Sequence, residues 1–374
     1  MGTKTKGLFS KKERRWRDEL KRLPWLLLIP VGLLLPGFLA KHPDAVESVY
    51  SGKIYPFLAK LFVALNSKLA FSVTEFVIMG LIVGAVVAVM LWFVRSGNKS
   101  RTLLRLFRLA VSLGITAGIM LNLFYVLWGC NYFRKDLSEL MQLDVKERSV
   151  EELELLCEKL AQDAVLLREQ VAEDEQGVYK IADVDAAFLS LPDAYEKLMA
   201  THTVFGGTVG VAKQVKVSKL MSHAGIAGIY IPYMFEPNVN AHQDDLLLIS
   251  SAAHEMAHQL GFAHEDEANF ISYLACMSSD DPAVRYSGTM LALITAANRL
   301  YQNDSEAYYE LYGGYSDGMI RDLKYHSQYW KAFEGKTRET FDNINDSYLK
   351  FNQQETGVQS YGEMVDLLLA YYQP

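Results

Sequence analysis

This sequence of 374 residues has few cysteines and no net positive charge. The three cysteines, Cys130, Cys157 and Cys276, have neither the paired spacing of a zinc ribbon nor the density of a disulfide-stabilised scaffold. The net charge is -7, and the C-terminal two thirds of the chain are acidic. A nucleic-acid-binding protein carries positive charge across a folded surface, so we expect no nucleic-acid partner.

Charged residues are also missing from three long apolar runs in the N-terminal third of the chain. Uncharged runs of this length are typical of helices that cross a lipid bilayer. We therefore predict a membrane anchor at residues 1–128 and a separate globular domain at residues 129–374. The predicted spans are residues 24–40, 74–94 and 107–128.

Basic residues predict the orientation of these spans. Nine Lys and Arg residues precede the first span, and five more, from Arg95 to Arg108, lie between the uncharged runs 76–94 and 109–128. Such residues favour the cytoplasmic side, so the N-terminus is predicted inside and the globular domain outside. Phe38 and Leu39 precede the end of the first span instead of the small residues of a cleavage site, which favours an uncleaved anchor.

The globular part is predicted to be mainly helical with a small β-sheet. Ser149 and Glu152 form a capping-box pattern at the start of an amphipathic helix. Residues 183–200 indicate a second helix, broken by Pro192, whereas 208–235 have the composition of strands. Helical periodicity returns at Asp244 and continues to the end, with breaks near Gly261, 280–282, 313–314 and Gly357.

The strongest chemical signal is the sequence HEMAH at residues 254–258. His254 and His258 are four residues apart in an apolar helix, so both imidazoles lie on one face and can reach one Zn²⁺. Glu255 can hold a water at the metal without being a ligand, and Gly261 is a suitable residue to end the helix. An isolated histidine pair of this spacing is more often structural, but the adjacent glutamate favours a metal site.

The HEMAH motif with the downstream EDEANF resembles the gluzincin group of HExxH zinc peptidases. The arrangement of spans, HExxH and the C-terminal SYGEMVDLLLAYY also resembles a family of bacterial membrane-anchored proteins assigned to that clan. The resemblance implies an α+β zincin-like metallopeptidase domain in the bacterial cell membrane. It does not specify the substrate, which we expect to be a peptide or protein. It also implies that His254 and His258 bind zinc and that Glu255 is the catalytic base in a metal-assisted hydrolysis.

The third zinc ligand has more than one candidate. The Glu-Ala-Asn run resembles the Glu-Ala-Asp from which some gluzincins take this ligand, which favours Glu267. Residues 254–264 also fit the metzincin pattern HExxHxxGxxH, in which His264 completes the site. No Met-turn follows, so Glu267 is preferred, His264 is the alternative, and Glu265 is the third choice.

The sequence also offers candidates for a second electrophile and for other functions. Tyr286, His326 and His223 are candidates for a second electrophile, and the segment 226–233 is a strand that could pair with an extended peptide. A rival function is a non-catalytic membrane protein with a structural or sensing metal site, closed by His264 or Glu265. Such a site has no need of Glu255. A transporter is disfavoured by the few spans and their lack of charged residues.

Overall fold

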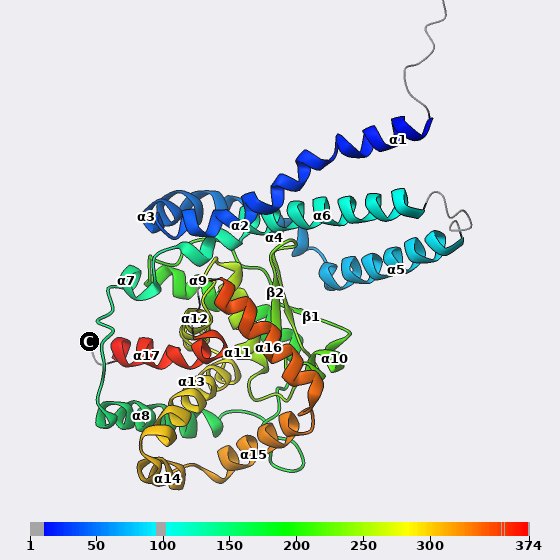
Figure 1. Ribbon diagram of the computed structural model, residues 1–374. Coiled ribbons are helices and arrows are strands. Elements are labelled where there is room, and N and C mark those ends of the chain that lie inside the picture. Colours follow the sequence, from blue (N-terminus) through cyan, green and yellow to red (C-terminus); the bar gives the residue numbers. More distant parts are fainter. Residues whose placement is uncertain (1–10, 95–101, 353, 355, 373–374) are drawn as a thin grey trace, which may run out of the picture. The chain divides into compact units, whose positions relative to one another are not determined.

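The computed structural model describes residues 11–94, 102–352, 354 and 356–372 (Figure 1). The chain forms two compact units, Met1–His42 with Phe76–Cys130, and Pro43–Glu75 with Asn131–Pro374. We call the first the helical unit and the second the globular unit. The basic residues before position 11, and Arg95, Lys99 and Arg101, lie outside the described residues.

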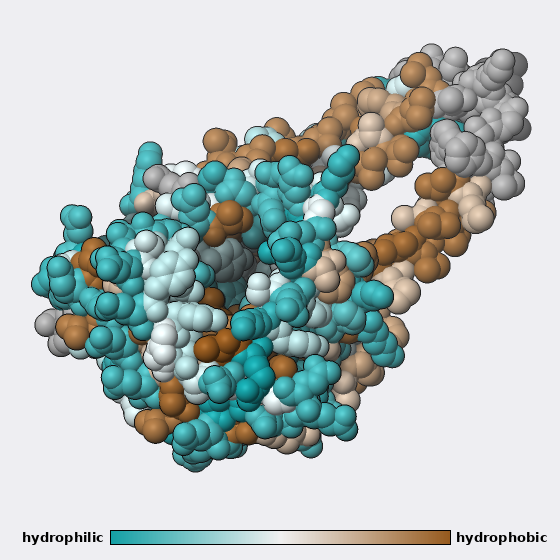
Figure 2. Space-filling view, turned by 90° about the horizontal axis from the view of Figure 1, so that it is seen from below, coloured by the Kyte–Doolittle hydropathy of each residue, from teal (hydrophilic) through white to brown (hydrophobic). Residues whose placement is uncertain are grey.

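The helical unit contains the three apolar segments. Its elements are α1 Lys11–Leu20, η1 Leu23–Leu27, α2 Leu28–Leu39, most of α5 Val73–Val94, and α6 Thr102–Leu127. Three helical segments are long and apolar enough to cross a membrane, Trp16–Leu39, Val73–Leu91 and Leu103–Leu127, which confirms that part of the prediction. Figure 2 shows apolar surface along these helices and mainly polar surface over the globular unit.

Small residues allow α2 and α6 to pack closely. A Cβ atom added to Gly118 would lie 2.9 Å from Cβ of Leu28, and the Asn122 side chain donates a hydrogen bond to the Leu28 carbonyl at 2.7 Å. Close approach at glycine and a polar contact between helices are typical of packing within a membrane.

The globular unit is mainly helical with one three-stranded sheet, as predicted. Its elements before the sheet are α3 Pro43–Ala45, η2 Val46–Ile54, α4 Tyr55–Asn66, most of η4 Gly129–Phe133, α7 Leu137–Met141, α8 Val150–Arg168 and α9 Val184–Thr201. The sheet region contains β1 Lys213–Gln214, α10 Ser218–His223, β2 Gly228–Ile231 and β3 Glu236–Val239. The remaining elements are α11 Leu248–Gln259, α12 Glu265–Met277, α13 Pro282–Asn303, α14 Ser305–Gly313, α15 Asp317–Lys331, α16 Lys336–Phe351, η5 Gly357–Glu363 and α17 Met364–Tyr372.

Most predicted element boundaries agree with the structure, and two predictions do not. The Ser149–Glu152 capping box is present at the start of α8. Pro192 does not break α9, because the surrounding turns bury Leu191 and Tyr195 against the core and outweigh the lost hydrogen bond. The segment 208–235 contains only short strands, separated by α10, and β3 lies just beyond it.

The segment between the first two apolar helices, residues 43–75, belongs to the globular unit. Tyr55 is buried, and its hydroxyl donates to the Gln259 carbonyl at 2.8 Å. Glu236 of β3 accepts hydrogen bonds from the backbone of Val73 and Thr74 at 3.1 and 2.9 Å. Contacts of this kind join residues 43–75 to the core that supports α11.

The sheet has the order β1-β3-β2, which makes β2 an edge strand. β2 pairs antiparallel with β3, with Ile229 opposite Asn238 and Tyr230 opposite Pro237. The Asn240 amide donates to the Ala227 carbonyl at 2.9 Å, so these two residues form a hydrogen-bonded pair. Hydrogen-bonded and non-hydrogen-bonded pairs alternate along antiparallel strands, which makes the pairs of Gly228 and of Tyr230 with β3 non-hydrogen-bonded. The backbone groups of Gly228 and Tyr230 therefore point away from β3, toward the open edge.

Candidate metal centre

Helix α11 carries the HEMAH motif through the centre of the globular unit. Its apolar residues, including Ile249, Ala253 and Met256, are fully buried. The helix ends in a Schellman motif, in which the amides of Gly261 and Phe262 donate to the carbonyls of His258 and Ala257 at 2.9 and 3.3 Å. Gly261 has φ +89°, a value that favours glycine. The turn predicted at Gly261 is therefore confirmed.

Helix α12 begins immediately after this turn and brings Glu265 to the two histidines. Glu265 is the first helical residue and is 8% exposed. Its Oε2 atom lies 3.0 Å from Nε2 of His254 and 3.5 Å from Nε2 of His258. One ligand atom from each of the three residues lies within 4.8 Å of the other two. Two imidazoles and one carboxylate thus converge on a single point.

The opposite ring nitrogens of both histidines are held by acceptors. Nδ1 of His254 lies 2.8 Å from Oδ1 of Asn269, and Nδ1 of His258 lies 2.7 Å from the Phe262 carbonyl. Because these oxygens accept a hydrogen bond, each ring carries a proton on Nδ1 and can present Nε2 to a ligand. This arrangement is typical of histidines that bind a metal.

The charges of the cluster fit a cation at its centre. Burial alone would lower the pKa of His258, but the Glu265 carboxylate outweighs it and raises that pKa to about 9. Burial opposes ionisation of Glu265, yet His258 and His254 hold its pKa well below the usual range. A buried carboxylate beside two imidazoles is suited to a site with positive charge at its centre, and a metal ion would supply that charge.

Glu255 lies beside this cluster and is not one of the three converging residues. Burial raises the pKa of its carboxyl to about 7, against the opposing effect of His254 and His258. The Tyr230 amide on the open edge of β2 donates a hydrogen bond to it. Gly228 leaves room for the carboxylate, because a Cβ atom at that position would lie 2.4 Å from Oε1 of Glu255.

Glu267 and His264, the two preferred candidates for the third ligand, do not belong to this convergent group. Glu267 points to the Leu137 amide, which donates to its Oε1 at 2.5 Å, and its Oε2 has no hydrogen-bond partner among the described residues. Nε2 of His264 faces the Tyr132 carbonyl at 3.2 Å. The geometry favours Glu265, the third choice, because α12 starts at that residue and turns its first side chain toward α11.

The three residues considered as a second electrophile have structural partners instead. The Tyr286 hydroxyl donates to Asp322 at 2.7 Å, within a buried group that includes Arg168. His326 contacts the Asp244 carboxylate at 2.9 Å, and His223 packs against a phenylalanine ring. None of the three belongs to the group of convergent ligand atoms found among the described residues.

Two residues at the site were not predicted. Asn269 follows Glu265 by four residues, so the helical period of α12 was a signal that could have placed it on the same face. Tyr361, in η5, stacks on His254 with ring centroids 6.3 Å apart. Nothing local in the sequence connects Tyr361 to the HEMAH motif, because the contact depends on how the C-terminal helices fold back.

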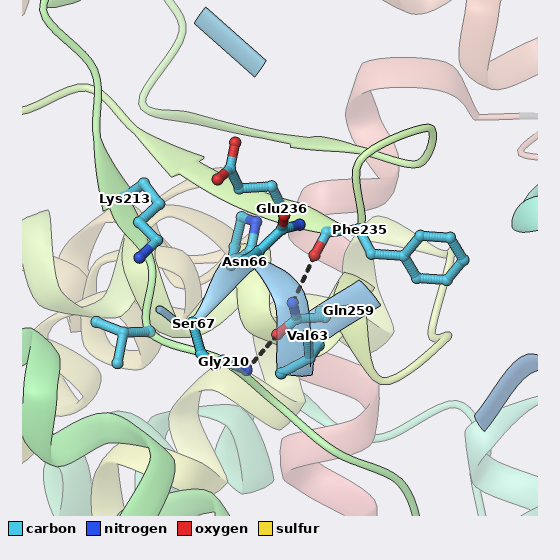
Figure 3. Close-up of a pocket in the computed structure, with 10 residues that line it drawn as sticks. Val63, Asn66, Ser67, Gly210, Lys213, Phe235, Glu236 and Gln259 are labelled. Atoms are coloured by element: carbon cyan, nitrogen blue, oxygen red, sulfur yellow. Dashed lines mark hydrogen bonds between the residues drawn. The ribbon is translucent and has the colours of Figure 1, made fainter. Parts of the chain in front are cut away.

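A small cavity lies beside the end of α11 but does not include the cluster (Figure 3). Its polar lining is occupied by structural contacts: Gln259 accepts from the Gly210 amide at 2.7 Å and donates to the Phe235 carbonyl at 2.6 Å. Lys213 donates to the Leu69 carbonyl, and Glu236 caps the start of α5. The cavity therefore supports the sheet and has no evident chemistry.

These observations define a mainly helical globular unit that contains a His-His-Glu cluster, in a chain with three candidate membrane-spanning helices. The chain belongs to the family described as "Protein of unknown function (DUF3810)", whose model matches residues 50–369. No curated protein and no solved structure matches the chain.

Proposed function

We propose that this protein is a membrane-anchored, zinc-dependent hydrolase of the zincin type, with peptide bonds as its substrates. The observation that carries the proposal is the convergence of Nε2 of His254, Nε2 of His258 and Oε2 of Glu265, with the Glu255 carboxyl beside them and outside the set. Two imidazoles with one carboxylate form a common catalytic zinc set.

The donor set is suited to an open metal site. Among the described residues only three ligands converge, which leaves a fourth tetrahedral position for water or substrate. When bound, zinc would supply a Lewis acid that polarises a carbonyl and lowers the pKa of water toward 7. A closed structural or sensing site, the rival interpretation, would use a fourth protein ligand and would not place a buried glutamate beside the set.

Glu255 is placed to move the proton. Burial raises the pKa of its carboxyl above the ordinary value, which favours the carboxylate as an acceptor of a proton from water. The hydrogen bond from the Tyr230 amide fixes the orientation of the carboxylate. In the proposed reaction Glu255 takes the proton of the attacking water and returns it to the leaving nitrogen.

The open edge of β2 supports an extended peptide as the substrate. The backbone groups of Gly228 and Tyr230 face away from β3, and Tyr230 contacts Glu255 directly. A peptide that added to this edge as a further strand would place its backbone against the proposed base. The predicted role of the segment 226–233 is thus supported by the position of β2 in the sheet.

The membrane arrangement is also a proposal, in which the N-terminus is cytoplasmic and the globular unit is extracytoplasmic. The basic flanks of the spans favour this orientation. Residues 43–75 and 131–374 are separated by two candidate spans and pack into one unit. Two crossings return a chain to the same side, so this packing agrees with three spans.

A comparison of membrane proteomes tests the activity. Cells that produce the wild-type protein should lose particular membrane or envelope proteins, or gain fragments of them, relative to cells that produce Glu255→Gln. Glu310→Gln, which changes an exposed glutamate, is the matched control and should behave as wild type. Identical fragment patterns in the wild type and Glu255→Gln would contradict a hydrolase that uses Glu255.

A further inference from the structure

Tyr361 reaches the candidate metal centre from the C-terminal part of the chain. The ring lies nearly parallel to that of His254, at an interplanar angle of 19° and a centroid distance of 6.3 Å. The residue is partly exposed, whereas the flanking Ser360 is buried. The ring therefore borders the candidate metal centre on the side of His254.

The Tyr361 hydroxyl has two hydrogen-bond partners with different roles. The Asn345 side chain on α16 donates to the phenolic oxygen, and the hydroxyl donates to the Glu265 carboxylate. A hydroxyl has one proton to donate. Because Asn345 occupies an acceptor position of the oxygen, the proton points into the centre. The charge of Glu255 also raises the pKa of the hydroxyl, which therefore lies near both Glu265 and the proposed base.

The main chain of Tyr361 is fixed by the same asparagine that orients His254. Nδ2 of Asn269 donates to the Tyr361 carbonyl at 3.2 Å, while Oδ1 of Asn269 lies 2.8 Å from Nδ1 of His254. Tyr361 is thus held at its backbone by α12 and at its oxygen by α16. A donor fixed at both ends needs little reorganisation when charge develops in front of it.

We propose that Tyr361 is a further catalytic residue, whose hydroxyl turns from the Glu265 carboxylate and donates its one hydrogen bond to the carbonyl oxygen of the scissile bond as that oxygen becomes negative. The inference rests on the proposed function. In the reaction, water oxygen bonds to the carbonyl carbon, the C–N bond breaks, and Glu255 carries the proton to nitrogen. Tyr361 keeps its own proton throughout. Asn345 is a positioning residue that directs that proton.

A purely structural role makes a different prediction. If Tyr361 only orients Glu265, removal of the hydroxyl should weaken metal binding, as is typical of groups that hold metal ligands. If it stabilises the oxyanion, metal binding should be retained, and the affinity for an anionic oxygen at the centre should fall.

The experiment uses the full-length, detergent-solubilised protein loaded with Co²⁺, with acetohydroxamate as the probe. Metal content and the visible spectrum report the loaded centre, and titration gives the affinity for the probe anion. For Tyr361→Phe we expect unchanged metal content and probe affinity reduced about tenfold or more, as for loss of a hydrogen bond to a charged group. Asn345→Ala should lie between this variant and the wild type. On any peptide that the wild type cleaves, Tyr361→Phe should lower kcat about 10²- to 10³-fold.

Tyr348→Phe is the matched control, because its hydroxyl lies 3.2 Å from that of Tyr132 and the residue shares α16 with Asn345. It should keep the wild-type affinity for the probe. Loss of metal from Tyr361→Phe would overturn the proposed role of Tyr361. So would unchanged probe affinity and kcat in a variant that retains its metal. Either result would leave the proposed function standing. A wild-type protein that binds neither Co²⁺ nor the probe would overturn the proposed function itself, and this inference with it.

Discussion

Gly228 is the position where a single methyl group tests the placement of the proposed base. In Gly228→Ala the new Cβ atom would lie 2.4 Å from Oε1 and 2.7 Å from Cγ of Glu255. Gly228 lies in a regular strand and lacks the positive φ that would strain an alanine. The perturbation therefore falls on the Glu255 side chain and not on the backbone.

The size of the effect follows from these distances. Ordinary van der Waals contact at a Cβ atom begins at 3.4 Å, so the carboxylate must move by about 1 Å. The end of a glutamate side chain can move that far by rotation, which keeps the cost in folding stability at or below the ~1–3 kcal/mol of an overpacked core. A misplacement of about 1 Å in a catalytic group can lower the rate about 10²-fold.

The assay is zinc content and hydrolysis of purified Gly228→Ala, with Gly206→Ala as the control. Gly206 also lacks positive φ, and a Cβ atom there would have no neighbour within 4 Å, so its variant should match the wild type. We expect one zinc per chain in both variants and a rate about 10²-fold lower in Gly228→Ala alone. A wild-type rate in Gly228→Ala would show that the Glu255 carboxylate does not act where the structure places it.

Three further predictions concern the ligands and the membrane arrangement. Glu265→Ala should lose bound zinc whereas Glu267→Ala should retain it; elemental analysis showing the reverse would restore the prediction made from sequence. Asn269→Leu should weaken zinc affinity about 10- to 100-fold, because Nδ1 of His254 loses its hydrogen-bond acceptor. Chelator competition measures this affinity, and an unchanged value would show that Asn269 has no role in the site. A cysteine at exposed Asn303 should react with an impermeant reagent in intact cells, since the three native cysteines are buried, and protection would reverse the topology.

The parts of the site that sequence predicts are those set by local geometry. His254 and His258 share a face because the helical period places residues four apart together, and this holds wherever the helix packs. Gly261 ends the helix for an equally local reason. The third residue of the cluster depends instead on where the next helix begins. α12 starts at Glu265, so the first carboxylate after the turn faces α11 and Glu267 faces Leu137.

Long-range contacts account for what the sequence did not predict. The contact between Tyr361 and His254 exists only because η5 packs against α12, and no spacing or composition near either residue indicates it. The assignment of residues 43–75 to the globular unit has the same origin, since Tyr55 joins that unit through distant contacts such as its hydrogen bond to Gln259. Apolar length identifies candidate spans, and it carries no information about the segments between them.

If a bound metal and Glu255 act together in hydrolysis, removal of the Glu255 carboxylate should abolish activity and leave the metal in place. Zinc content and peptide hydrolysis should be measured on the same purified preparations of the full-length wild type and Glu255→Gln. We expect about one zinc per chain in both proteins, and hydrolysis in the wild type only. Loss of zinc from Glu255→Gln would contradict this, because Glu255 would then be a ligand. Equal hydrolysis by the two proteins, or a wild type without bound metal, would contradict it as well.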